Sequence, residues 1–543
     1  MTQGYHDPGG WQRSVHQRRV GQHASASMDK CYVVPRPPAN LRLVAWGKPK
    51  VMSSPQTQTE GRIQELIDRP KLGLWRLAGP MIVGMSVHTL YLIGDFAFIG
   101  QVGEEALAGV TLVGPLYFVI FAVLNGVGIA VTALVAQALG RDDREEASRV
   151  ASGSIGVSLL VGLVFAVAGI STGPELLRLL GARGALHSAA WEYFQIIAAT
   201  MPVFFLSGAL RSILTGEGDA KTPTLVMVIS TALNLGLDAV FILGLGMGVR
   251  GAALATAAAV SFSALSLAWV ILVRRSSLVR IKARSLGFQR ALFDGLWHIG
   301  LPAALGQLIM AIGGAATNRL LTSFGSHALA GYGAASRVDM IVAIPVFGIA
   351  GAAVTLVGVF AGAGRQDLVR RTALYAYRWA IGLAVLAGLG AWLGSVPIMR
   401  IFVTNDLAVA VGQTYLLFGL AMYPMMAFGV TTGRLLQGLG LGLPALVITT
   451  LRVLAIAVPS SYVAVYVFDA PIEAIWASLV AGGLASSLLA IFWVRRLLWL
   501  RDPTVFASSR VSPSTGALPT AAGVLPPPVE PVPEVAPQAR AKR

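Results

Sequence analysis

The sequence predicts an all-α integral membrane protein of twelve transmembrane helices in two homologous six-helix lobes. Composition is the first observation that predicts this class. Of the 543 residues, 55% are hydrophobic and only 13% are charged, whereas roughly 25% of residues are charged in a soluble globular protein. The second observation is that apolar runs of about 20 residues, the length that crosses a bilayer, recur along most of the chain. The third is an internal repeat that divides the chain into halves.

Each apolar run defines one expected span, because a helix rises ~1.5 Å per residue and a run of this length crosses the hydrocarbon core. The expected spans are 77–99, 111–138, 150–172, 188–213, 223–246, 250–273, 297–322, 336–361, 372–395, 408–433, 445–468 and 472–499.

Lys and Arg residues orient the spans, because short cytoplasmic loops retain positive charge. Basic residues follow the second, fourth, sixth and eighth spans, and the most basic connection is 274–296. The connection after the first span, 101–109, contains Glu104 and Glu105 but no Lys or Arg. We therefore expect a multi-pass protein of the cell inner (plasma) membrane with both termini in the cytoplasm. The net charge of +16 is explained by these loops, and no nucleic-acid partner is expected.

The two halves repeat at one constant offset along the chain. Residues 103–109, Gly-Glu-Glu-Ala-Leu-Ala-Gly, return as Gly-Ser-His-Ala-Leu-Ala-Gly at 325–331, and Pro80 returns at the same offset as Pro302. Six spans is an even number, so both lobes insert in the same direction. Their pseudo-two-fold axis then runs along the membrane normal, with the substrate path between the lobes.

These features divide the chain into five parts. We expect a largely disordered cytoplasmic N-terminal tail (1–70), with a start at Met52 as the alternative to a tail of this length, and an N-terminal lobe (71–273). A basic cytoplasmic linker (274–296) leads to the C-terminal lobe (297–500). The Pro- and Ala-rich residues 501–543 are expected to form a disordered cytoplasmic tail. The single cysteine excludes a disulfide framework within one chain.

Two carboxylates, Asp95 and Asp238, lie inside expected spans. A charge at membrane depth costs at least ~2.5–3.5 kcal/mol, so such residues usually have a function there. The repeat places Thr317 and Ser460 at the equivalent positions of the second half. We therefore expect binding and release of a small cation, H⁺ or Na⁺, to be confined to the first lobe.

Helix geometry brings further oxygen atoms to the same depth. Asn234 and Asp238 are four residues apart and share a helix face, as do Tyr91 and Asp95. Thr256 lies in the first turns of the next span, on the same side of the membrane. Carboxylate, amide and hydroxyl oxygens suit hard cations, whereas a desolvated pair of carboxylates suits a proton. The residues leave H⁺ and Na⁺ both open.

The chain resembles the multidrug and toxic compound extrusion (MATE) family, specifically its DinF-like branch, over residues 70–500. The motifs that support this resemblance are Gly79-Pro80, Asp95-Phe96-Ala97-Phe98-Ile99-Gly100, Ala106-Leu107-Ala108-Gly109, Asn234-Leu235-Gly236-Leu237-Asp238 and Gly251-Ala252-Ala253-Leu254-Ala255-Thr256. The resemblance implies a monomeric secondary antiporter that exports organic cations in exchange for H⁺ or Na⁺. It implies coupling-ion ligands at Asp95, Asn234, Asp238 and Thr256, supporting cavity residues at Tyr91, Tyr193 and His88, and a helix bend at Pro80.

Two other functions compete with this one. A lipid-linked oligosaccharide flippase of the same superfamily should need a basic cavity, and we find no intramembrane basic cluster in the first lobe. An enzyme should show metal-ligand spacings or a nucleophile with a base, and neither is present in the sequence. We therefore expect no enzymatic activity, no cofactor apart from the coupling ion, and only small organic molecules and membrane lipids as partners. Arg337 and Asp339, near the start of the eighth span, are expected to form an interfacial polar cluster.

Overall fold

The computed structural model describes residues 55–274, 277–287 and 289–496. The side chains of residues 55–60, 91–93, 95–97 and 283 are outside the described part, and so are both predicted tails beyond 55–496. All regular elements of the described residues are helices, which confirms the predicted fold class.

The helices follow one another with short connections. In the first half they are α1 (Pro55–Asp68), α2 (Pro70–Val102), α3 (Glu104–Gly140), α4 (Arg144–Leu179), α5 (Gly184–Gly216), α6 (Lys221–Asp238), the π-helical η1 (Ala239–Gly244) and α7 (Gly248–Leu272). After η2 (Ala283–Ser285), the second half contains α8 (Arg290–Gly295), η3 (Leu296–Gly300), α9 (Leu301–Leu321), η4 (Thr322–Phe324), α10 (Ser326–Gly362), α11 (Gln366–Leu393), α12 (Ser395–Phe402), α13 (Asp406–Gly438), α14 (Gly442–Thr450), η5 (Leu451–Ala457), α15 (Val458–Phe468) and α16 (Glu473–Val494).

Eleven helical segments of the described residues are long and apolar enough to span a membrane. They correspond to the second to twelfth expected spans. The first expected span lies in α2, where six side chains are outside the described part. Helix α2 has a proline at its first position. Proline is typical there, because the first N–H groups of a helix have no acceptor within the helix and nothing is lost when one of them is absent.

Helix α1 was not expected, because the sequence analysis placed residues 1–70 in a tail. The buried side chain of Leu66 explains the helix: it packs against α2 at Gly73, where it lies 2.9 Å from the position a Cβ would occupy. Arg62 of α1 also pairs with Asp219, with 3.5 Å between Nη1 and Oδ2. Residues 55–68 are therefore an ordered part of the fold.

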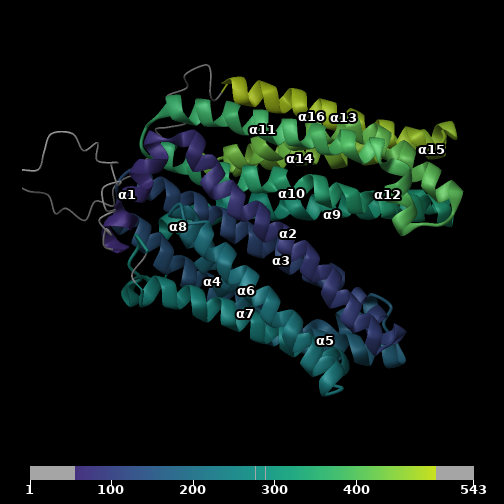
Figure 1. The fold of residues 1–543 in the computed structure, drawn as a ribbon, viewed down its shortest axis with the longest axis horizontal. Helices are drawn as coiled ribbons and strands as arrows, with labels where there is room; N and C mark the ends of the chain where they lie inside the picture. Colours follow the sequence, from purple (N-terminus) through teal and green to yellow (C-terminus); the bar gives the residue numbers. More distant parts are fainter. Residues whose placement is uncertain (1–54, 275–276, 288, 497–543) are drawn as a thin grey trace, which may run out of the picture. The chain divides into compact units, whose positions relative to one another are not determined.

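Helices α2 to α7 pack mainly on one another, and α9 to α16 form a second group. Figure 1 shows the two groups by colour, purple to teal for the first and teal-green to yellow for the second. Contacts between the groups come mainly from α2 and α3 on one side and α9, α10 and η3 on the other.

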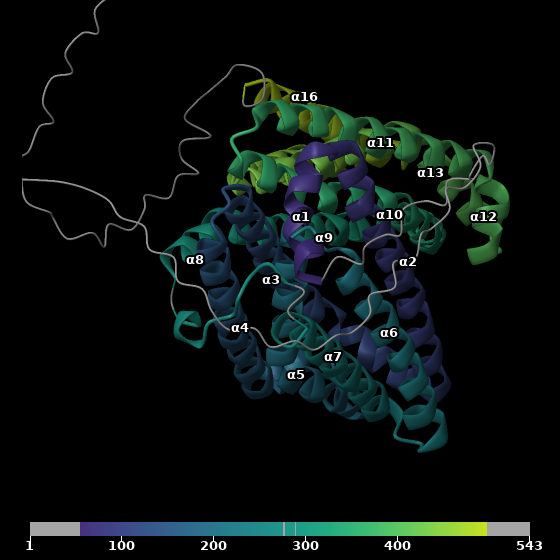
Figure 2. The ribbon, with the colours of Figure 1, turned by 60° about the vertical axis from the view of Figure 1, so that its left-hand side comes forward.

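The segment between the halves packs on the first half. Glu217, which follows α5, is fully buried and accepts hydrogen bonds from the Ser277 hydroxyl and from the backbone N–H groups of Leu278 and Val279, both at 3.1 Å. Burial raises the pKa of Glu217 to about 7. We call the end of the helices that carries residues 277–287 the linker end (Figure 2).

Two serines of α4 hold the same segment. Ser148 Oγ accepts from the backbone N–H of Arg280, and Ser152 Oγ accepts from that of Lys282, both at 3.0 Å. The basic linker predicted from sequence is thus fixed along α4 by its backbone, and Lys282 Nζ also lies 3.9 Å from Glu145 Oε1 of α4.

The two halves approach each other most closely near the linker end. A Cβ at Gly362 of α10 would collide with the backbone of Gln137 in α3, and one at Gly358 would lie 2.8 Å from Ala136 Cβ. Gln137 Nε2 also donates to the carbonyl oxygen of Gly438 in α13, at 2.8 Å. Only glycine permits helix backbones to meet this closely, so these positions form a tight closure between the halves.

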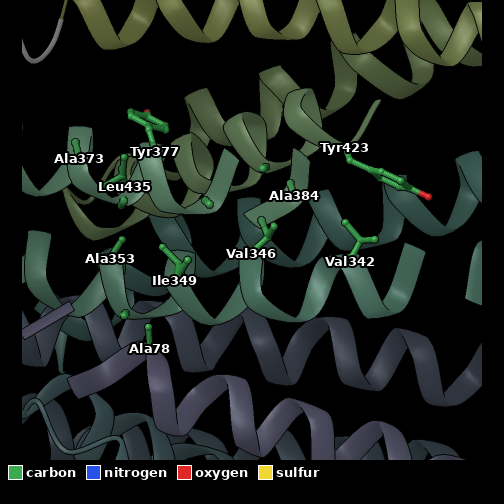
Figure 3. Close-up of a cluster of buried hydrophobic side chains, with 14 of the residues drawn as sticks. Ala78, Val342, Val346, Ile349, Ala353, Ala373, Tyr377, Ala384, Tyr423 and Leu435 are labelled. Carbon is green, nitrogen blue, oxygen red and sulfur yellow. The ribbon is translucent and has the colours of Figure 1, made fainter. Parts of the chain in front are cut away.

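A buried apolar cluster continues from this closure into the second half. Ala78 of α2 lies beside α10, and α10 in turn packs on α11 and α13. Figure 3 labels ten of its members: Ala78, Val342, Val346, Ile349, Ala353, Ala373, Tyr377, Ala384, Tyr423 and Leu435. The cluster makes α10 the central helix that connects the two groups.

Candidate ion site in the first half

Three predicted site residues come together between α6 and α7. Asn234, Asp238 and Thr256 are all buried. In the amide orientation that satisfies both neighbours, Asn234 Nδ2 donates to Asp238 Oδ2 at 3.2 Å, and Asn234 Oδ1 accepts from the backbone N–H of Thr256 at 3.1 Å. The amide therefore connects the carboxylate of α6 to the backbone of α7 in its third turn.

The side chain of Thr256 adds a further oxygen. Its hydroxyl is buried and forms no hydrogen bond within the described part of the chain. A buried polar atom without a partner is costly, so its retention here is consistent with an oxygen kept for a ligand. Carboxylate, amide and hydroxyl groups are the donor types that a hard cation prefers.

The backbone around the carboxylate is irregular. Asp238 ends α6 and is followed directly by the π-helical η1. Single π-helical turns occur frequently at functional sites, because the extra residue reorients the neighbouring side chains. One hydrogen bond fixes α6 to α7 a turn before the site: Ser230 Oγ donates to the carbonyl oxygen of Ala259 at 2.6 Å.

Helix α2 passes close to this pair. A Cβ at Gly94 would lie 2.8 Å from Leu235 Cδ2, in the residue next to Asn234. Farther toward the linker end, Gly84 meets the side chain of Met227. The two glycines bring α2 against α6 along its length. The side chains of Tyr91 and Asp95 are outside the described part, so their predicted contribution to the site stays a prediction.

The remaining predicted residues lie in different surroundings. Tyr193 of α5 is buried in an apolar cluster that also contains Ile99 and Ala252. His88 of α2 is exposed, and Arg211 of α5 lies within electrostatic reach of it. All three remain candidates for the cavity around the site.

Helix α2 runs without a break through Pro80. Proline lacks an N–H, so the helix loses one backbone hydrogen bond at that position. The predicted bend at Pro80 remains a property to be tested.

Two polar clusters of the structure were not among the predicted site residues. One is Glu217 with the linker segment, and the other is Asp339 with Tyr415 and Tyr423 in the second half. The signal for the second cluster was present: an acid lies inside an apolar stretch, and two tyrosines eight residues apart share a face of a neighbouring helix.

Comparison with known proteins identifies the family. The MatE family model matches residues 80–240 and again residues 302–463. This chain belongs to the MatE family. The two matches begin at Pro80 and at Pro302, which are equivalent positions of the internal repeat. The protein is thus a multi-pass membrane transporter of the MATE type and not an enzyme.

Individual relatives agree. The chain is 26% identical over 445 residues to the "Probable multidrug resistance protein NorM" of Thermotoga maritima, covering 79% of this chain and 94% of that protein. It is 24% identical over 424 residues to the "Multidrug export protein MepA" of Staphylococcus aureus, covering 77% and 92%. A solved structure described as the outward-facing conformation of a multidrug resistance MATE family transporter of the MOP superfamily matches with a TM-score of 0.76 and 29% identity, over 80% and 98% of the two chains.

Proposed function

We propose that this MATE transporter is a secondary antiporter that exports drug-like organic cations in exchange for H⁺ or Na⁺. The observation that carries the proposal is the buried Asn234–Asp238–Thr256 arrangement, in which an amide joins a carboxylate to the backbone of the neighbouring helix, beside an unbonded hydroxyl. The names of the relatives from Thermotoga maritima and Staphylococcus aureus support drugs as the exported class.

The coupling ion binds at this arrangement, with Asp95 of α2 as the fourth ligand. Helix α2 is held against α6 at Gly84 and Gly94, so a charge change at Asp238 alters the packing of α2 as well. Pro80 gives α2 a weakened backbone position at which it bends when the ion binds. The fourth ligand and the bend follow the DinF-like branch of the family.

Ion binding drives exchange because the ion has different affinities for the two states of the protein. The Lys and Arg distribution indicates that the linker end faces the cytoplasm, with both termini on that side. The tight contact of α3 with α10 at the linker end then closes the cytoplasmic side, and the state described here is open outward. The moving bodies are the lobes 71–273 and 297–500, working as a monomer in the plasma membrane.

A second candidate is export of an anionic or lipid-linked phosphate substrate, as in a flippase. Three arginines inside the spans favour it: Arg211, Arg434 and Arg452 have no carboxylate within ion-pair distance among the described residues. Two of them contact methionine sulfur instead, Arg211 at Met227 and Arg452 at Met310. Only Arg211 lies in the first half, on α5, whereas Arg434 of α13 and Arg452 of η5 lie in the second half.

Proteoliposomes separate the two candidates. Vesicles with an imposed H⁺ or Na⁺ gradient receive a fluorescent organic cation or a fluorescent anion of similar size. We expect cation uptake driven by one of the two gradients, lost in Asp238→Asn and retained in Asp294→Asn, which removes an exposed carboxyl from α8. Gradient-independent transport of the anion alone would overturn the antiporter proposal.

A further inference from the structure

A second carboxyl group lies within a helix of the second half, where it is half-buried. Asp339 is in α10, about 20 Å along the helix from its start at Ser326, at ~1.5 Å per residue. An interfacial cluster was expected here from the sequence, since the expected eighth span begins at residue 336. The helix in fact begins ten residues earlier, and Asp339 lies well within it.

Two tyrosines of α13 hold this carboxyl. Tyr415 Oη donates to Asp339 Oδ2 at 2.6 Å, and Tyr423 Oη donates to Oδ1 at 2.7 Å. Both tyrosine side chains are buried. Each carboxyl oxygen therefore has one phenol donor, and the two donors lie about two turns apart on a single neighbouring helix.

Aromatic rings surround the group. Tyr332, two turns before Asp339 on α10, stacks on Trp476 of α16 with ring centroids 5.6 Å apart and planes at 20°. Tyr415 meets the same tryptophan edge to face, at 4.9 Å and 78°. The rings therefore pack on one another beside the carboxyl and its two phenol donors.

The nearby cations on α10 and α12 are engaged elsewhere. Arg337 lies over the ring of Phe402, 5.6 Å from its centroid. Arg400 of α12 pairs with Asp406, with 3.2 Å between Nη2 and Oδ1. Within the described residues, Asp339 forms no ion pair.

One further cation approaches the cluster from η5. Arg452 lies within electrostatic reach of Tyr415, but its Nη2 contacts Met310 Sδ at 3.2 Å. No hydrogen bond joins it to Asp339 within the described part of the chain. A carboxylate at membrane depth without an ion-pair partner is costly, and one bound proton removes that charge.

We propose that Asp339, held by Tyr415 and Tyr423, is a proton-binding site in the second half, separate from the Asn234–Asp238 site. The inference rests on the proposed ion-coupled exchange and extends it to the second lobe. A proton fits better than Na⁺, because both phenols donate hydrogen to the carboxyl, whereas a hard cation needs several oxygen atoms that face it as ligands.

The proton balance is simple. On binding, one O–H bond forms at a carboxyl oxygen of Asp339. The phenol that faced this oxygen rotates its own hydrogen away and accepts in turn, as a tyrosine hydroxyl is able to do. On release the O–H bond breaks and the proton returns to water. No other bond is made or broken.

The repeat shows that this site is not a copy of the first. The offset that relates Pro80 to Pro302 also relates Tyr193 to Tyr415 and Tyr117 to Asp339. The two halves thus carry their carboxyls on non-equivalent helices. Asp339 is on α10, the helix whose other end forms the closure with α3 at its glycines, so a proton there changes the charge of a helix that both halves share.

Infrared difference spectroscopy tests the site without transport. Purified protein in lipid is titrated from neutral to acid pH, and the C=O stretch of protonated carboxyls is followed. We expect a band from a buried carboxyl that is lost in Asp339→Asn and kept in Asp238→Asn and in the exposed-acid control Asp294→Asn. Tyr415→Phe, which keeps the ring packing, should shift both the band frequency and the pH at which the band appears.

The outcomes distinguish this site from the proposed function. An Asp339→Asn spectrum identical to wild type, or a band that Tyr415→Phe leaves unmoved, overturns the proton site. Failure of the antiporter proposal would appear instead as absent gradient-driven uptake in protein whose Asp339 band titrates normally. If Asp339→Asn does not fold, Tyr415→Phe and Tyr423→Phe retain the carboxyl, and the absence of any shift in both overturns the proposal.

Discussion

The closure between α3 and α10 predicts that one methyl group changes which side of the transporter is open. At Gly362 a Cβ would collide with the backbone of Gln137, and a backbone atom cannot rotate aside as a side chain does. The variant Gly362→Ala should therefore push the two helices apart at the linker end. It adds no charge, and its methyl group meets the backbone of α3 and not a residue of the ion site.

The size of the effect follows from overpacking. An extra methyl group in a tightly packed contact typically costs about 1–3 kcal/mol. The cost falls only on the state in which the helices touch, so it changes the balance between two states by about 5- to 150-fold. A population that is mainly closed at the linker end in wild type should become mixed or mainly open there.

Spin-label distances measure this balance. Cysteines at the exposed positions Glu145 and Gln366, one in each half near the linker end, carry the labels after Cys31 is replaced by serine. We expect a longer-distance population to grow in Gly362→Ala. Gly333→Ala is the matched control, because it makes the same change on the same helix where a Cβ meets nothing within 4 Å.

An unchanged distance distribution in Gly362→Ala would refute the reasoning, as would an equal shift in Gly333→Ala. The first result would mean that the halves do not separate at this contact. The second would mean that helix propensity, which favours alanine over glycine by roughly 1 kcal/mol, and not the close approach, sets the balance.

Three further predictions follow from single contacts. Burial raises the pKa of Glu217 from 4.5 to about 7 in the folded protein, so the folded state binds a proton more tightly than the unfolded state, and the free energy of unfolding falls by about 3 kcal/mol as pH rises between these values, at ~1.36 kcal/mol per pKa unit. The melting temperature of Glu217→Gln should therefore depend less on pH over this range than that of wild type, and an equal pH dependence in both proteins would contradict this. Asn234→Ala removes the amide between Asp238 and Thr256, which leaves buried groups unpaired at about 1–3 kcal/mol, and should weaken ion binding about tenfold by calorimetry; unchanged affinity would exclude the amide from the site. Gln137→Ala loses the bond to the Gly438 carbonyl and should raise the open fraction in the spin-label assay, though less than Gly362→Ala; a larger rise would reverse the ranking of the two contacts.

The sequence predicted the fold because its strongest signals are local. Apolar runs and basic loops are read residue by residue, and the repeated glycines and prolines made the duplication visible. Helix α1 was missed for the opposite reason: its 14 residues are polar on average, and its order depends on Leu66 packing against α2, a tertiary contact that no local pattern shows.

The site was only partly predictable. Asn234 and Asp238 are four residues apart, a spacing that places two residues on the same helix face, so their proximity was expected from the sequence. The contact of Asn234 with the backbone of Thr256 depends on how α7 packs on α6 and was not. The partners of Asp339 were not expected, because Tyr415 and Tyr423 reach it from α13 and no local pattern shows that tertiary contact.

Coupled counter-movement of the ion is the measurement that tests the central claim most directly. Vesicles loaded with a transported cation are diluted into substrate-free medium, and the internal pH and internal Na⁺ are recorded together. The account predicts that substrate leaving the vesicles draws one of these ions inward in wild type and in Asp294→Asn, and that Asp238→Asn abolishes this ion movement. Substrate efflux without any ion movement, or an unchanged ion flux in Asp238→Asn, would contradict it.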